Sequence, residues 1–236
     1  MSRLVPQRST ILAASCLIFG AWLAVAPCVR AAAGAAPAAP KAAAPASVPE
    51  FVSAVRKLFD PANAGDWVAA ARQSTACKDA LKKVQADLAK SSAAQQTSLT
   101  QIAADLAALD TATTAKTRQA ALLSASRIFR GSGALADTFI NKVPQPVWQM
   151  EYLAHDLLVW SADPADLTKL KALPAQIEAE FNRVGQDVAA RGGDDLALEF
   201  VQEMTALNAA ATAADFAKLA KPLLDTLDKI EKAYSE

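Results

Sequence analysis

Apolar residues recur at steps of three and four along most of the chain from residue 47 onward. This spacing places them on one face of an α-helix, because an α-helix turns once in about 3.6 residues. The clearest stripes are Phe51-Val55-Leu58-Phe59, Cys77-Leu81-Val84-Leu88, Leu99-Ile102-Leu106-Leu109 and Leu196-Phe200-Met204-Leu207. Clusters of β-branched or aromatic residues are rare, and alanine, the best helix former, supplies most of the apolar excess. The pattern therefore predicts an all-α domain.

Local signals divide this domain into separate helices. Ser47 is a predicted N-cap, with a proline in the first turn and Glu50 at the capping-box position. The polar interval 91–96 favours a break between two helices, and a polar patch on one long helix is the alternative. Around Gly131 and Gly133 the apolar phase continues, so one helix with a notch of small residues is expected. The notch lets a neighbouring helix approach closely or kinks the helix, or it makes room for a ligand.

Three predicted helices open with the same kind of tripeptide: a small residue, an aspartate and an apolar residue. These are Gly65-Asp66-Trp67, Ala165-Asp166-Leu167 and Ala214-Asp215-Phe216. Each follows a shorter apolar helix and a turn of small residues, so the repeating unit is a helical hairpin. The predicted fold is therefore a set of antiparallel helical hairpins, arranged as a helical bundle or as a short TPR-like solenoid.

The N-terminal region carries targeting signals in place of the helical pattern. Residues 1–31 have the positive start, apolar run and small-residue end of a secretory signal peptide. Residues 32–46 are rich in alanine and proline and are predicted to form a disordered tether before the helical domain, residues 47–236. Export to the periplasm or the exterior is therefore expected, with no membrane span in the mature chain. Lipid anchoring at Cys16 and an uncleaved N-terminal anchor are the less favoured alternatives.

Charge and cysteine content narrow the choice of partners. The chain has 24 basic and 24 acidic side chains, and the predicted signal peptide holds three of the basic ones and none of the acidic ones. The mature chain thus has 21 basic against 24 acidic side chains, interspersed along the helices. This argues against nucleic acid, which would require a concentrated basic face. Cys77 is the one cysteine after the signal peptide, so the core and not a disulfide must hold the fold.

The sequence contains no known catalytic signature, neither a nucleophile elbow nor a phosphate-binding glycine loop nor a pair of zinc-binding histidines. Its densest group of aromatic and polar residues lies at 146–160. On a helix, Trp148, Tyr152 and His155 share a face, and Glu151 is one turn before His155. His155 is the only histidine of the chain.

Three interpretations of this group remain open. It is the buried face of a core helix, with His155 hydrogen-bonded to Glu151 or to solvent. It is the wall of an apolar ligand site, which the glycine notch would enlarge. Or it belongs to a metal or haem site, in which His155 is joined by Met150 or Met204.

These observations favour a non-catalytic binding protein of the cell envelope over an enzyme. It would act as an adaptor for another envelope protein, or as a carrier of an apolar, lipid-like small molecule. The alternative is a helical bundle that binds a transition metal or haem through His155. No cofactor is expected outside that alternative.

Overall fold

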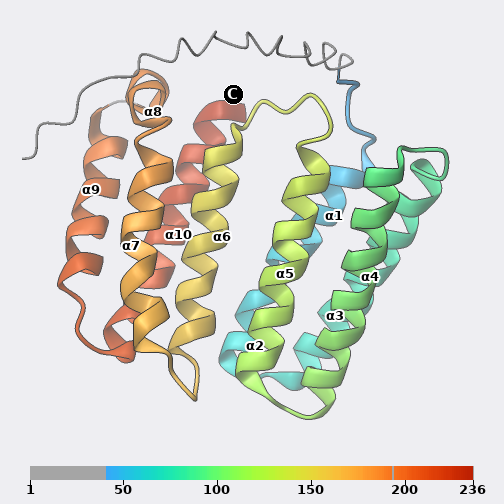
Figure 1. Cartoon of the computed structure of the whole chain (residues 1–236), viewed down its shortest axis with the longest axis horizontal. Coiled ribbons are helices and arrows are strands. Elements are labelled where there is room, and N and C mark those ends of the chain that lie inside the picture. The colour runs from blue at the N-terminus through green and yellow to red at the C-terminus, as the bar shows by residue number, and fades with distance from the viewer. Residues whose placement is uncertain (1–40, 193, 236) are drawn as a thin grey trace, which may run out of the picture. The chain divides into compact units, whose positions relative to one another are not determined.

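The computed structural model describes residues 41–192 and 194–235, and all the regular elements in this part of the chain are helices. They are α1 (Ser47–Arg56), α2 (Phe59–Ala64), α3 (Trp67–Asp87), α4 (Ala93–Thr114), α5 (Arg118–Ala136), α6 (Gln145–Ser161), α7 (Leu167–Phe181), α8 (Gly185–Gly192), α9 (Asp194–Ala209) and α10 (Ala213–Ser235) (Figure 1). The prediction of an all-α domain is confirmed.

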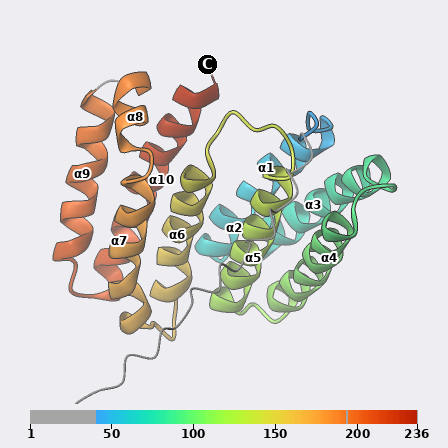
Figure 2. The same cartoon turned by 45° about the horizontal axis from the view of Figure 1, so that its top comes forward.

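The helices form two bundles, which contact each other through α5 and α6. In the first, α1 and α2 pack on α3 and α5, and α4 also packs on α3 and α5. In the second, α6 packs on α7 and α10, and α9 packs on α7, α10 and the short α8. Helices α5 and α6 lie side by side and join the two bundles (Figures 1 and 2). Because α1 packs back on α5 and α10 packs back on α6, each set closes into a bundle, whereas the helices of a solenoid contact only their neighbours along the stack.

Capping side chains explain where several helices begin. Asp66 and Asp166 are the N-caps of α3 and α7, and each accepts a hydrogen bond from a backbone N–H of the first turn. The third opening differs from the predicted repeat. There Asp215 lies inside α10 and accepts hydrogen bonds from the backbone N–H and the hydroxyl of Thr212. The three openings are therefore alike in sequence but not in structure.

The predictions for the interval 91–96 and for Ser47 had different outcomes. Ser92 is the N-cap of α4 and forms a capping box with Gln95, so the predicted break is confirmed. The predicted N-cap at Ser47 is wrong, because α1 begins at Ser47 itself. The Ser47 hydroxyl instead donates to a carboxylate oxygen of Asp87 on α3, at 2.6 Å. The Ser47 side chain therefore makes a tertiary hydrogen bond and not the capping hydrogen bond that the local pattern predicted.

The glycine notch lies within the continuous helix α5, as predicted. A methyl group at Gly131 would lie only 2.9 Å from Cγ1 of Ile102, so the missing side chain lets α4 and α5 approach closely. At Gly133 the nearest side-chain atom is Cε3 of Trp148, at 3.9 Å, which is an ordinary contact. Farther along, α7 ends at Phe181 and the short helix α8 begins at Gly185.

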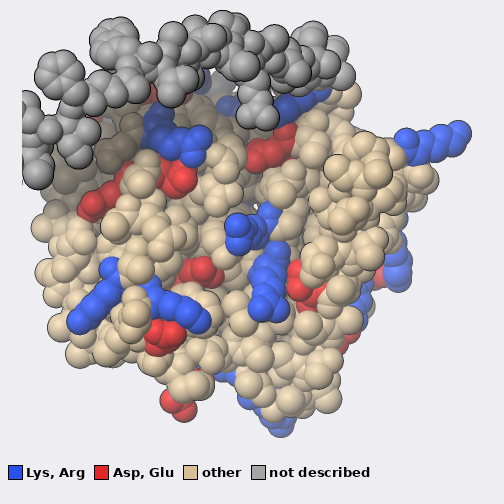
Figure 3. Space-filling view, in the orientation of Figure 1, with Lys and Arg blue, Asp and Glu red and all other residues tan. Residues whose placement is uncertain are grey.

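The N-terminal predictions fall mostly outside the described residues, which exclude the predicted signal peptide and residues 32–40 of the tether. Residues 41–46 lie against the loop between α5 and α6, where the N–H of Ile140 donates to the carbonyl of Ala42 at 2.9 Å. Among the helices described, none is long and apolar enough to cross a membrane. Basic and acidic side chains are interspersed on the face of the molecule that Figure 3 shows.

Candidate functional site

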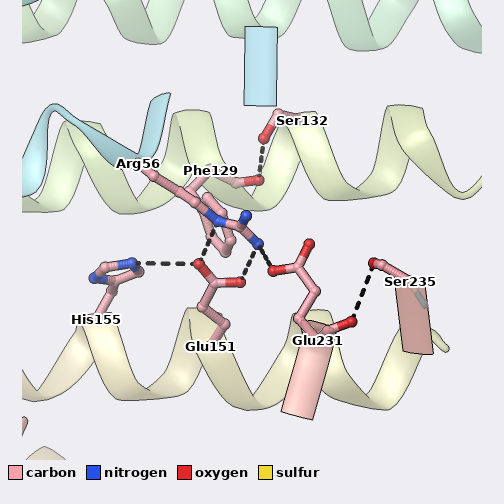
Figure 4. Close-up of polar contacts among 7 residues, drawn as sticks. All are labelled: Arg56, Phe129, Ser132, Glu151, His155, Glu231 and Ser235. Carbon is pink, nitrogen blue, oxygen red and sulfur yellow. Dashed lines mark hydrogen bonds and ion pairs between the residues drawn. The ribbon is translucent and has the colours of Figure 1, made fainter. Parts of the chain in front are cut away.

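The most connected polar group lies where the two bundles meet on the side of α1 and α10. Arg56, in the last turn of α1, donates from Nε and Nη2 to the two carboxylate oxygens of Glu151 on α6, each at 2.6 Å. Its Nη2 also donates to Glu231 on α10 (Figure 4). One guanidinium therefore ties three helices together, with the two-pronged geometry that arginine forms with carboxylates.

Burial governs the electrostatics of this ion cluster. The Glu151 side chain is only 5% exposed. Burial raises the pKa of Glu151 to about 7, although Arg56 pulls that pKa down. Burial also opposes the charge on Arg56, but the carboxylates of Glu151 and Glu231 outweigh it and raise the pKa of the guanidinium. Arg56 thus stays charged, while Glu151 can take up a proton near neutral pH.

His155 lies beside this cluster but is held by aromatic rings. Its imidazole stacks on Phe59, with centroids 3.6 Å apart, and meets the edge of Phe129 at 5.4 Å. Nε2 is 3.9 Å from Oε1 of Glu151, which is too long for a hydrogen bond. Burial, with a smaller contribution from Arg56, lowers the pKa of His155 to about 3. The imidazole is therefore neutral at pH 7, and Nδ1 has no hydrogen-bond partner among the described residues.

An apolar cleft of about 520 Å³ opens between α1, α10 and the loop that precedes α6. We call it the apolar cleft, and it is lined by Ala44, Val48, Pro49, Val52, Ser53, Arg56, Ala136, Ile140, Asn141, Lys142, Val143, Trp148, Glu231 and Ser235. More than half of these residues are apolar. The guanidinium of Arg56 lies over the Trp148 ring, 5.1 Å from the ring centroid. The wall of the apolar cleft therefore contains an aromatic ring in contact with the ion cluster.

A second and smaller cleft, of about 290 Å³, also borders on Arg56. This polar cleft is lined by Arg56, Lys57, Phe59, Asp60, Asn63, Glu151, His155, Leu158, Ala217, Lys221, Leu224, Asp225 and Asp228. Because the Arg56 side chain borders both clefts and bonds to α6 and α10, it divides the space between the bundles into an apolar and a polar part.

Helix α6 does not bring the predicted ligand-binding residues into one cleft. Trp148 lines the apolar cleft, whereas Glu151 and His155 line the polar cleft. Tyr152 lines a third cleft of about 440 Å³ between α5, α6 and α7, where the guanidinium of Arg130 lies 5.1 Å from its ring centroid. The two glycines of the notch line none of these three clefts.

The residues named for the metal or haem alternative are also spread out. Met150 and His155 are five positions apart on α6, which turns their side chains about 140° away from each other. Met204 lies in the core on α9, in the second bundle. Within the described part of the chain, no group of three or more His, Cys, Asp or Glu side chains is placed to hold a metal ion. Of the residues predicted for the apolar ligand site, His155 and Glu151 do come together, with Nε2 3.9 Å from Oε1.

Sequence reasoning missed Arg56 and Glu231. Arg56 is separated from Glu151 by 95 positions and from Glu231 by 175. The one local signal was a basic residue directly after Val55 of an apolar stripe, a feature that many surface helices share. Arg56 reaches Glu151 and Glu231 only because α1, α6 and α10 pack together in the folded protein.

Comparison with known proteins adds no family to this description. No protein-family model, no curated protein and no solved structure matches the chain.

Proposed function

We propose that this chain is a non-catalytic binding protein of the cell envelope that carries a small apolar molecule in the apolar cleft. The observation that supports this most directly is the cleft itself. Its volume of about 520 Å³ lies within the range of roughly 300–1,000 Å³ typical of small-molecule sites. Its lining also has the usual composition of such sites, mostly apolar residues with an aromatic ring and a few polar groups.

The polar groups near the cleft support binding in preference to acid–base catalysis. Arg56 forms ion pairs with Glu151 and Glu231, so these three charges serve to link α1, α6 and α10. His155 is neutral, stacked on Phe59, and lies on the wall of the other cleft. The export signal predicted from residues 1–31 supports a place in the envelope.

A first experiment uses the mature protein purified from its own envelope fraction. Native mass spectrometry should show added mass that organic solvent removes. The recovered protein should then bind the apolar fluorophore N-phenyl-1-naphthylamine. A protein with no added mass that also fails to bind this fluorophore would refute the carrier function.

A pair of variants locates the binding site. Ser53 is exposed on α1 and lines the apolar cleft, so Ser53→Trp should fill part of the cleft and weaken fluorophore binding by about tenfold or more. Thr75 is exposed on α3 and lines none of the three clefts, so Thr75→Trp should bind as the wild type does. Equal binding by both variants would place the fluorophore elsewhere.

An adaptor for another envelope protein is the second candidate, and one observation favours it. Leu198 and Val201 are both exposed on α9, one turn apart, so they form a small apolar stripe on the outside of the second bundle. Leu198→Asp with Val201→Asp should abolish capture of an envelope partner if this function holds, and should leave fluorophore binding unchanged.

A further inference from the structure

The two bundles are joined closely at one place and loosely at another. Helices α5 and α6 pack closely, whereas α1 has no extensive packing contact with α6 or α10 among the described helices. On that side lie the apolar and polar clefts, and between them Arg56 donates hydrogen bonds to Glu151 and Glu231 (Figure 4). The stack of His155 on Phe59 is a further contact there. A rotation of the bundles about the α5–α6 contact would therefore separate Arg56 from its carboxylates and widen both clefts.

The ion cluster at this place holds more acid than base. One guanidinium, that of Arg56, faces the carboxylates of Glu151 and Glu231, and Asp228 lines the polar cleft beside them. The Glu151 side chain is only 5% exposed, against 19% for Glu231. Water therefore compensates the excess negative charge least at Glu151, where the charged form is least favourable.

The other elements around Glu151 do not remove this excess. Helices α5 and α2 present the uncharged rings of Phe129 and Phe59, His155 is neutral, and the described residues of α7 line neither of the two clefts. The remaining charged residues of the polar cleft are Lys57, Asp60, Lys221 and Asp225, with Lys221 and Asp225 paired at 2.9 Å. These four charges sum to zero, so the excess stays with the ion cluster.

Opening would hydrate Glu151, and this sets the sign of a pH effect. In the closed structure burial raises the pKa of Glu151 to about 7, because it outweighs the attraction of Arg56. In water a glutamate has a pKa of about 4.3. The closed form thus binds the proton more tightly, so proton uptake favours closure and proton loss favours opening. For these two pKa values the ratio of open to closed molecules rises by up to about thirtyfold between about pH 5.5 and about pH 8.

We propose that the ion cluster of Arg56, Glu151 and Glu231 is a proton-dependent latch that sets the width of the apolar cleft and so controls how firmly the carried molecule is held. This proposal rests on the carrier function proposed above and names its regulation. Arg56 and Glu231 line the apolar cleft, whereas Glu151 lines the polar one. Glu151 is therefore a positioning residue that acts on the apolar cleft through Arg56. Proton uptake by Glu151 keeps the cleft closed on its ligand, and proton loss lets α1 move away from α10.

The first test measures dissociation of N-phenyl-1-naphthylamine, which is uncharged at both pH values, from the full mature protein. The dissociation rate should be about threefold or more higher near pH 8 than near pH 5.5. Glu151→Gln has nearly the shape of the protonated side chain and does not titrate, so its rate should be slow at both pH values. Glu50→Gln is the matched control, because Glu50 is exposed on α1 and lines neither cleft. It should keep the pH dependence of the wild type.

A second test needs no ligand. Ser53 on α1 and Ser235 on α10 are both exposed and line the apolar cleft. Spin labels on Ser53→Cys and Ser235→Cys report the width of the cleft by double electron–electron resonance, while the buried Cys77 stays unlabelled. The distance between the labels should be longer near pH 8 than near pH 5.5. With Glu151→Gln added, the distance should stay short at both pH values.

The outcomes separate the two proposals. If the fluorophore does not bind, the carrier function fails, and the label distance alone decides whether the latch exists. If it binds but the label distance is the same at both pH values, the latch is refuted while the carrier function stands. Faster dissociation near pH 5.5 would also refute the latch. A pH dependence that Asp228→Asn removes and Glu151→Gln leaves intact would overturn the role of Glu151.

Discussion

Replacing Arg56 with methionine removes the guanidinium that faces the buried carboxylate of Glu151. Methionine keeps most of the side chain's apolar length, so the change acts mainly on charge and hydrogen bonding. Glu151 loses both of its hydrogen bonds from Arg56, and Glu231 loses one. Glu151, whose side chain is 5% exposed in the wild type, is then left on α6 with no cation in contact.

The expected cost follows from that burial. Removing one partner of a buried ion pair costs about 3–5 kcal/mol of unfolding free energy, because the remaining charge is neither solvated nor paired. Glu151 can escape part of this cost by taking up a proton. We therefore expect Arg56→Met to lower the free energy of unfolding by about 3 kcal/mol near pH 8.

The pH dependence has a definite sign. The pKa of Glu151 in the folded protein is about 7, above the value of about 4.3 for an unfolded chain, so the protonated form favours folding and stability falls as pH rises through this window. Without Arg56 the folded pKa rises further, because the attraction that lowers it is gone. Above about pH 7 the variant therefore keeps losing stability while the wild type does not. The deficit should be smaller by about 1 kcal/mol or more near pH 5.5 than near pH 8.

Urea unfolding followed by circular dichroism at the two pH values measures this deficit. In the background of Glu151→Gln, which has no titrating group at this position, the effect of Arg56→Met should depend on pH much less, and what remains should come from Asp228, whose pKa burial raises and Arg56 lowers. Lys83 and Glu50 serve as the exposed comparison, with side chains 67% and 61% exposed and 3.6 Å apart. Lys83→Met should cost less than about 1 kcal/mol. A loss from Arg56→Met that is no larger than this, or that is the same at both pH values, would refute the reasoning.

Three further predictions concern the packing of the buried core. Leu106→Asp places a charge in the buried centre of α4 and should cost more than about 3 kcal/mol in urea unfolding, and an unchanged midpoint would contradict the packing. Gly133→Ala should stabilise α5 by about 0.5–1 kcal/mol through helix propensity, whereas Gly131→Ala should gain nothing or destabilise, since its methyl would meet Ile102 at 2.9 Å. Burial raises the pKa of Cys77 to about 12, so its thiol should react with a disulfide reagent at pH 8 only after unfolding in urea; rapid reaction of the folded protein would show that it is accessible.

The helical stripes read from the sequence match the core closely. Cys77, Leu81, Val84 and Leu88 are all buried, as their spacing of three and four residues requires. The break at 91–96 was also predictable, because a capping box is formed by residues three apart. The period, the caps and the breaks act over one or two turns of helix, so a single sequence carries their signal.

The candidate site was predictable only in part. Trp148, Glu151 and His155 belong to it as expected, since they lie on the side of α6 that faces the space between the bundles. Tyr152, although it shares a helical face with Trp148, lines a different cleft. The face of a helix is broad enough to contact several neighbours, and periodicity does not say which neighbour lies against which edge.

What the sequence by itself determined is the mainly helical nature of the domain that begins at residue 47, the faces that are buried, and several of the breaks between helices. Only the tertiary structure decided that α1 closes on α5, that α10 closes on α6, and that Arg56 meets Glu151 and Glu231 between the two bundles. The physical reason is the distance along the sequence between the residues that interact. Helix formation and capping depend on residues within about four positions of one another, whereas the clefts and the ion cluster depend on contacts across 95 and 175 positions, which exist only after the whole core has packed.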